Sequence, residues 1–218
     1  MKIIIGYLYN DLLNLYGDSG NVKTLVYHLK EQGIDVEVKN ISLEDKKDFK
    51  SIDLLYIGSG TEENILTALS DLKKDVKEIE KFINDKKFIL ATGNSVEIFG
   101  NYIIINKKIK ALGVYDYVAM HQNRIVNDIK IDSDLVDSPI IGFENHPGKI
   151  LTYDGVFRID NFIGTYIIGP LLVRNPDLCK LLVSELIKSK DKNFELKDGN
   201  YDLDYKAYAN TIKSINKR

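Results

Sequence analysis

The first hundred residues alternate short apolar runs with longer segments whose apolar residues recur at helical spacing, and this alternation restricts the possible fold most strongly. Residues 2–8 (KIIIGYL) and the alternating residues 34–38 (IDVEV) predict two strands, and residues 22–29 predict the helix between them. A third strand over residues 52–57 and a long helix over residues 62–84 follow in the same order. Strands that alternate with helices predict an α/β fold, with a mostly parallel sheet flanked by helices.

The stretch FILATGNSVEIFG, residues 88–100, continues this pattern and ends in a sharp polar turn. Residues 88–91 are too few and too apolar for an amphipathic helix, so we predict a buried strand, with a helix starting at Asn94 or Ser95. Parallel sheets bind ligands at the carboxyl ends of their strands. The turns predicted to meet at that edge are residues 9–21, 58–61, 92–95 and 168–172.

The sequence after Gly100 changes character and predicts a β-rich second half. The expected strands are short runs separated by turn residues, at 102–105, 112–120, 125–131, 140–143, 150–157 and 163–167. Asn175 and Pro176 are typical of a helix start, and residues 202–216 predict a last helix. Because no linker or repeat interrupts the chain, we expect one domain over residues 1–218.

The composition excludes several classes of protein. Lys and Arg number 30 against 32 Asp and Glu, so the chain has no excess of positive charge for nucleic acid. The single cysteine, Cys179, excludes an internal disulfide and a multi-cysteine zinc cluster, so we expect a cytoplasmic protein without a metal or cofactor. The amino terminus lacks a signal-peptide cleavage site, and no window approaches the roughly eighteen apolar residues of a membrane span.

The predicted turns carry a resemblance to a known family. YLYNDLLNLYGDSGN at residues 7–21, IGSG at 57–60, GFENHPGK at 142–149 and GTYIIGPLLVRNPDL at 164–178 resemble the CobB/CobQ-like class I glutamine amidotransferases. Within that family, these pieces are most similar to the GatD-type glutaminase subunits of lipid II isoglutaminyl synthase. The resemblance covers nearly the whole chain and implies a flavodoxin-like amidotransferase fold and a role in peptidoglycan biosynthesis.

The family's chemistry needs a cysteine on a strand-to-helix turn and a histidine base, and both positions differ here. The family elbow resembles A-x-C-G-G-Y-Q-x-x-G, and counting back from Gly100 without a gap places Gly93 on the cysteine. An insertion of one residue would place Thr92 there but would break the spacing to Gly100. The family histidine precedes a Gly-Pro pair, and the matching residue in GTYIIGPLL is Ile168. The resemblance therefore implies that no catalytic residues remain at these two positions.

Cysteine, histidine and serine side chains elsewhere in the chain are the candidates to replace the missing nucleophile and base. We predict that Cys179 is an inert core residue among the leucines of its helix, and that His146 is structural. We predict that Ser95 caps the helix of the elbow and that His28 is a solvated residue on its helix, while no partner for His121 can be named.

Ligand contacts are predicted where polar residues of the family pattern are kept. Arg124 matches an arginine that resembles a glutamine-carboxylate contact, and a guanidinium suits a carboxylate. The other candidates are Gly58, Ser59 and Gly60 in the oxyanion-like turn, Asn94 and Ser95 at the elbow, Asp18 and Asn21 in the first loop, and His146.

Three functional hypotheses follow from the resemblance. The first is a noncatalytic binding or regulatory subunit, a pseudoenzyme paired with a Mur-ligase-like protein or with an active paralogue. The second is an active glutaminase subunit that supplies ammonia to a Mur-ligase-like partner for lipid II amidation. The third is a hydrolase or transferase with a rebuilt site that uses Thr92, Ser95, Glu97 or His146. Glutamine or a related small molecule is the expected ligand.

Overall fold

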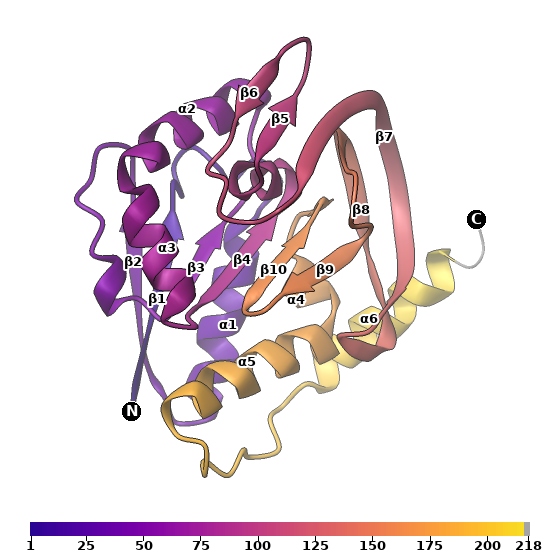
Figure 1. Cartoon of the computed structure of the whole chain (residues 1–218). Helices are drawn as coiled ribbons and strands as arrows, with labels where there is room; N and C mark the ends of the chain where they lie inside the picture. Colours follow the sequence, from indigo (N-terminus) through magenta and orange to yellow (C-terminus); the bar gives the residue numbers. More distant parts are fainter. Residues whose placement is uncertain (216–218) are drawn as a thin grey trace.

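The central sheet of the computed structural model, which describes residues 1–215, has the predicted parallel arrangement (Figure 1). Its strands are β1 (Lys2–Leu8), β2 (Asp35–Ile41), β3 (Leu54–Ile57), β4 (Phe88–Thr92), β9 (Val156–Ile159) and β10 (Phe162–Thr165). They lie in the order β2-β1-β3-β4-β10-β9, and all pairs are parallel except that of β9 with β10. The predicted α/β fold with a mostly parallel sheet is therefore confirmed.

Helices cover both faces of this sheet. α1 (Ser19–Glu31) and α5 (Pro176–Lys190) pack on one face, whereas α2 (Glu62–Leu72) and α3 (Val76–Asn84) pack on the other. Successive side chains of β4 point to opposite faces of the sheet. Phe88 and Leu90 belong to the core on the α1 side, and Ile89 and Ala91 belong to the core on the α2 side. Since both faces are buried, the strands are continuous apolar runs.

A second sheet stands beside the first, in the order β11-β8-β7-β5-β6. It consists of β5 (Tyr102–Ile104), β6 (Lys108–Lys110), β7 (Val118–Ser133), β8 (Val136–Ile150) and β11 (Ile167–Ile168). β7 and β8 form a long antiparallel hairpin that arches beside β9 and β10 (Figure 1). The remaining helices are α4 (Leu171–Arg174) and α6 (Asp202–Ile215), and short 3-10 helices span Phe49–Ser51, Lys73–Asp75 and Gly93–Phe99.

The hairpin contains an irregularity that positions a site residue. His121 pairs with Gly148 and Ile125 pairs with His146, so β7 advances four residues where β8 advances two. The partner residue between them, Pro147, has no backbone N–H for the ladder. The extra residues of β7 bulge away from the ladder and include Arg124.

Several predicted boundaries are wrong. The helix over residues 62–84 is interrupted by the 3-10 turn Lys73–Asp75, and the strand expected over 112–120 begins only at Val118. The runs 125–131 and 140–143 are parts of the two long hairpin strands. The last helix is described as far as Ile215, and its predicted end, Asn216, lies outside the described residues. No helix in residues 1–215 is long and apolar enough to cross a membrane. The single domain over residues 1–218 stays a prediction.

Candidate functional site

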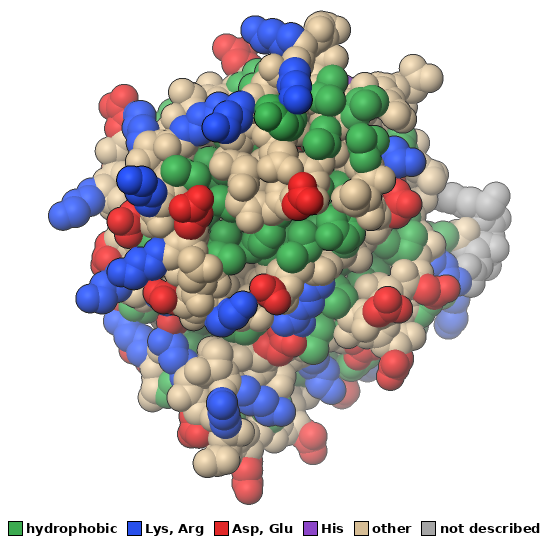
Figure 2. Space-filling view, in the orientation of Figure 1, with side chains coloured by type: hydrophobic (Ala, Val, Ile, Leu, Met, Phe, Trp, Pro, Cys, Tyr) green, Lys and Arg blue, Asp and Glu red, His purple; other side chains and the backbone are tan. Residues whose placement is uncertain are grey.

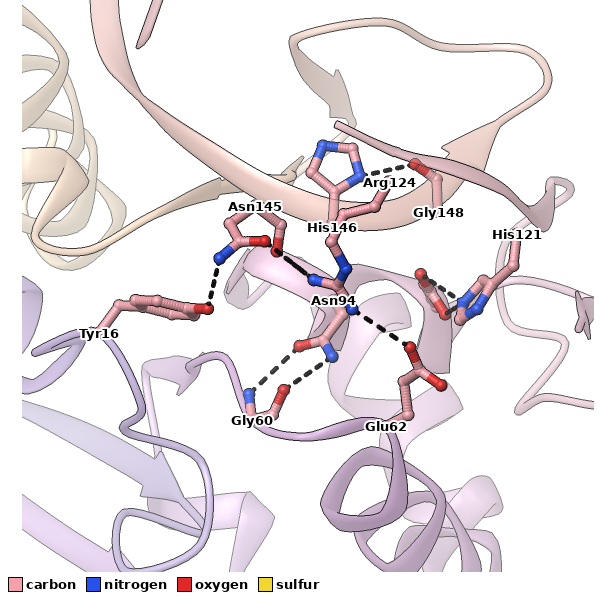
Figure 3. A network of polar contacts seen from close by, with 10 residues as sticks. Tyr16, Gly60, Glu62, Asn94, His121, Arg124, Asn145, His146 and Gly148 are labelled. Carbon is pink, nitrogen blue, oxygen red and sulfur yellow. Dashed lines mark hydrogen bonds and ion pairs between the residues drawn. The ribbon is translucent and has the colours of Figure 1, made fainter. Parts of the chain in front are cut away.

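A cavity of about 580 Å³ lies where β3 and β4 end, and the turns after β1, β3 and β4 meet there as predicted. The hairpin closes its other side (Figure 3), together with Ile168 of β11. The residues that matter most for its chemistry are Tyr16, Ser59, Asn94, Arg124, Asn145 and Ile168. We call this cavity the elbow cavity, because the turn after β4 forms its floor.

The floor is built on Gly93, which follows β4 directly and has φ +65°. This is the left-handed region of backbone conformation, which residues with a side chain rarely adopt. The backbone after β4 thus makes a sharp turn of the kind that a nucleophile elbow requires. A Cβ atom added at Gly93 would lie 2.5 Å from Ser59 Cβ and 3.0 Å from Ile168 Cγ2. The space next to Gly93 is thus occupied by two neighbouring side chains.

Asn94 joins the elbow to the turn after β3. Its side-chain Nδ2 donates to the Gly60 carbonyl at 2.8 Å, and its Oδ1 accepts from the Gly60 N–H at 3.2 Å (Figure 3). Because this amide uses both ends on the neighbouring turn, the distance between the two turns is fixed.

A buried polar network supports the floor from below. The Asp18 carboxylate accepts hydrogen bonds from Ser59 Oγ at 2.8 Å, from the Tyr16 N–H at 3.2 Å and from Thr92 Oγ1 at 3.3 Å. Asn21 Nδ2 donates to the Tyr56 hydroxyl, which in turn contacts Thr92 Oγ1. Burial raises the pKa of Asp18, and the hydrogen bonds from Ser59, Tyr16 and Thr92 oppose that shift. These side chains hold Ser59 and Thr92 in fixed positions behind the elbow.

The rim of the cavity carries polar side chains from four separate parts of the chain, namely the loop after β1, α2, β7 and β8 (Figure 3). Arg124 Nη1 donates to Asn145 Oδ1 at 2.9 Å, and Asn145 Nδ2 donates to the Tyr16 hydroxyl at 3.0 Å. Arg124 Nη2 also lies 3.6 Å from Glu62 Oε1. A guanidinium with one exposed carboxylate neighbour can exchange it for a ligand carboxylate at little loss.

A second polar chain links the hairpin to the 3-10 helix of the elbow. His121 Nε2 lies 3.0 Å from Glu97 Oε2, and the Tyr166 hydroxyl donates to Glu97 Oε1 at 3.1 Å. The hydrogen bond with Glu97 raises the pKa of His121, while burial works against that shift. Glu97 is 2% exposed, so this pair is part of the interior and does not line the elbow cavity.

The predicted ligand contacts divide into two groups. Ser59, Gly60, Asn94, Arg124 and His146 line the elbow cavity, as does Ile168. Gly58, Ser95, Asp18 and Asn21 do not line it. Asp18, Asn21 and Ser95 are fully buried, and Gly58 lies against Asp18 and the Leu13 carbonyl. The structure therefore gives this second group a supporting place behind the floor.

Two predictions about single residues are wrong. Ser95 does not cap the elbow helix, because its hydroxyl donates to the carbonyls of Ile57 and Thr92. His28 is not solvated, since it is 2% exposed and its ring stacks on Tyr201 with centroids 4.0 Å apart. The prediction that Cys179 is a core residue is confirmed, because it is 1% exposed and burial raises the pKa of its thiol.

Sequence reasoning missed Asn145 and Glu62 as rim residues. Asn145 lies within the GFENH motif, where a polar Glu-Asn-His run interrupts an otherwise apolar strand, and that interruption was the available signal. Glu62 follows the GSGT turn and begins α2, but its position beside Arg124 depends on the bulge in β7.

The match to a family model and the similarity to two relatives identify the same protein family. Residues 4–175 match the CobB/CobQ-like glutamine amidotransferase domain. Two relatives carry the name lipid II isoglutaminyl synthase (glutamine-hydrolyzing) subunit GatD. The one from Streptococcus pneumoniae (strain ATCC BAA-255 / R6) is 31% identical over 214 residues, which cover 87% of this chain and 82% of the relative. The one from Staphylococcus aureus (strain N315) is 27% identical over 244 residues and covers 100% of this chain and 98% of the relative.

A solved structure described as a glutamine amidotransferase superimposes with a TM-score of 0.54 at 15% identity. The match covers 84% of this chain and 97% of that one. At this identity the likeness shows the fold alone.

Proposed function

Because the chain belongs to the CobB/CobQ-like glutamine amidotransferase family, we propose that it is a GatD-like subunit of a system that amidates a lipid-linked cell-wall precursor. The support is its similarity to two relatives named as GatD subunits of lipid II isoglutaminyl synthase, over 82% and 98% of their lengths. In this proposal a Mur-ligase-like protein activates the precursor, and the present chain binds beside it.

The elbow cavity is proposed to hold glutamine or a related small molecule. Arg124 is the residue placed to take a carboxylate, and Asn145 and Tyr16 hold it in position at the rim. The side-chain amide of Asn94 and the backbone of Gly60 hydrogen-bond to each other through both of their polar groups. These two residues therefore shape the cavity more than they bind the ligand.

The names of the relatives favour the version in which the subunit hydrolyses glutamine. That version needs a nucleophile and a base in the elbow cavity. The side-chain hydroxyls nearest the elbow, Ser59 and Thr92, both donate to the buried Asp18 carboxylate. Of these two hydroxyls only that of Ser59 belongs to a residue that lines the elbow cavity, where His146 is the histidine, so a hydrolysing version would rest on side chains other than a cysteine at the elbow.

The geometry of the floor favours the noncatalytic version, and one observation carries it. Gly93 stands at the elbow, and its side-chain space is filled by Ser59 and Ile168. The one cysteine of the chain, Cys179, is buried within α5 on the α1 side of the sheet. We therefore propose a subunit that binds at the elbow cavity without Cys-His glutaminase chemistry, with ammonia supplied in solution or by an active paralogue.

The test is a glutaminase assay on the purified chain, alone and with any Mur-ligase-like protein that is encoded beside it, together with calorimetric titration of glutamine. Glutamine binding without ammonia release above background supports the noncatalytic version. Ammonia release that increases with the partner present establishes the hydrolysing version instead. Failure to form a complex with the ligase-like protein would contradict the shared proposal.

A further inference from the structure

A second cavity of about 270 Å³ lies under the hairpin, between β7, β8 and β9. Its walls are mainly apolar and include Ile125, Ile129, Ile131, Tyr153, Phe157 and Tyr166. Three charged residues also line it, the carboxylates Glu144 and Asp154 and the exposed Lys149. Hydrophobic side chains gather over β9 and β10 beside the hairpin (Figure 2). We call it the hairpin cavity. It shares only His146 with the elbow cavity, so His146 forms the wall between the two.

His146 is held firmly in this wall. Its Nδ1 lies 2.6 Å from the Gly148 carbonyl, and because a carbonyl only accepts, Nδ1 carries a proton (Figure 3). Its ring also stacks on Tyr166, with centroids 4.1 Å apart and planes 8° apart. The side chain is 5% exposed, and Nε2 is buried without a hydrogen-bond partner among the described residues. In the neutral ring, this Nε2 is an unpaired acceptor.

A carboxylate lies beside this acceptor. Glu144 Oε1 is 3.7 Å from His146 Nε2, which is too far for a hydrogen bond, and both residues line the hairpin cavity. One positively charged group with several N–H bonds can reach two acceptors at this separation. The pair is insufficient for a metal, because residues 1–215 contain no group of three or more His, Cys, Asp or Glu able to hold one.

We propose that the hairpin cavity binds a primary alkylammonium group, which donates N–H bonds to His146 Nε2 and to the Glu144 carboxylate. A compact ammonium suits two acceptors that meet at one point, whereas a guanidinium needs a flat, forked partner. The isoleucine and tyrosine walls accommodate the alkyl stem. The stem can come from a free amine or from a lysine side chain of a partner protein. This inference does not depend on whether the elbow cavity hydrolyses glutamine.

The probe is n-pentylammonium, titrated into the full chain by calorimetry, with 1-pentanol as its uncharged counterpart. We expect pentylammonium to bind at least about tenfold more tightly than pentanol, because its ammonium group forms charge-assisted hydrogen bonds that the hydroxyl of pentanol does not. Ammonium chloride and N-acetyl-lysine amide, titrated separately, distinguish a free ammonium ion, an alkylamine and a lysine side chain as the source. Equal binding of pentylammonium and pentanol would overturn the proposal.

Two variants test the acceptors, and a third is the control. Glu144→Gln removes the charge, and His146→Asn keeps a donor for the Gly148 carbonyl but removes the Nε2 acceptor. Each should weaken pentylammonium binding about tenfold or more. Asp154→Asn removes an exposed carboxylate that lines the same cavity and should change affinity less than about twofold. Thermal melting confirms that each variant is folded, and an affinity loss equal in all three contradicts the assignment.

A direct measurement covers the remaining alternative. A ¹⁵N-detected spectrum of the free protein shows which ring nitrogens of His146 carry protons, and the proposal requires Nδ1, which faces the Gly148 carbonyl, to carry one and Nε2 to carry none. If both ring nitrogens are protonated, Glu144 is the internal counter-ion of His146, the acceptor is absent and the proposal fails.

Discussion

The floor of the elbow cavity is closed and tightly packed, whereas its rim is open and polar. At the floor, the space beside Gly93 is filled by Ser59 and Ile168, and a Cβ there would come within 2.5 Å of Ser59 Cβ. At the rim, Arg124, Asn145 and Tyr16 come from three separate elements and are joined by hydrogen bonds of 2.9 and 3.0 Å. Both regions border one cavity of about 580 Å³.

This difference shows that the two parts of the elbow cavity are held by different kinds of interaction. The sharp turn at the floor depends on backbone conformation and on the buried network around Asp18, and it persists with a glycine at its apex. The rim depends on side chains carried by a β-bulge and a loop. Substitutions can therefore alter the floor and the rim separately.

The largest effect is expected when the floor is rebuilt to carry a cysteine and a histidine. The triple variant Gly93→Cys, Ser59→Gly, Ile168→His introduces a thiol at the elbow, removes the side chain that would block it, and places an imidazole beside it. We expect glutamine hydrolysis to rise by about 10²- to 10⁴-fold over the unmodified chain, as measured by ammonia release. The double variant without the histidine is the control and should gain much less. A high activity of the unmodified chain, lost in Ser59→Ala, would show that the floor is already catalytic.

The close packing of the floor can be tested by stability alone. Gly93→Ala should lower the free energy of unfolding by about 2–4 kcal/mol, because the residue has φ +65° and its Cβ would overlap Ser59. Urea unfolding gives the value. Ser59→Gly by itself loses the hydrogen bond to Asp18, so the two changes are compared in a double-mutant cycle. In the Ser59→Gly background the cost of Gly93→Ala should be smaller by about 1 kcal/mol or more, since the overlap disappears while the backbone strain remains. Strictly additive effects would mean that the two residues do not compete for the same space.

The polar rim is tested by the ligand. Arg124→Ala should weaken glutamine binding about tenfold or more, and Arg124→Lys should recover only part of the loss because the forked geometry is gone. Arg174→Ala, an exposed arginine of α4 outside the elbow cavity, is the matched control and should leave the affinity unchanged. An equal loss of glutamine affinity in Arg124→Ala and Arg174→Ala would mean that the arginines act through the overall charge of the protein and that Arg124 makes no specific contact with glutamine.

The sequence predicted the parallel sheet well because its strands are buried on both faces and appear as continuous apolar runs. β7 and β8 were predicted as fragments, since exposed polar residues interrupt them and their continuity depends on pairing with each other. His28 was misplaced because Tyr201, which covers it, comes from the far end of the chain.

The elbow itself was predictable, but its packing was not. The position of Gly93 at the turn after β4 was predicted from the spacing within one motif. That Ser59 fills the space beside it required the distance between two turns, which Asn94 and Gly60 fix in three dimensions. The same limit applies to His146, whose unpaired Nε2 is a property of its surroundings and not of the motif that contains it.

The smallest predicted effect concerns the link between floor and rim. His121 on β7 and Glu97 in the elbow helix are 3.0 Å apart, and this hydrogen bond raises the pKa of His121. A histidine whose pKa is raised by folding stabilises the protein fully below its unfolded pKa of about 6.5, and that contribution is lost as pH rises through the higher folded pKa. We therefore expect the free energy of unfolding to fall by on the order of 1 kcal/mol across that interval, measured by urea unfolding at several pH values.

His121→Gln should remove this step, which separates it from titration elsewhere. Glu62 and Arg124 also act on the pKa of His121, in opposite directions, so their variants should shift the midpoint of the step without removing it. If glutamine binding weakens over the same pH interval in the unmodified chain but not in His121→Gln, the link also orients the rim. A pH step that survives in His121→Gln would place its origin outside the contact between hairpin and elbow.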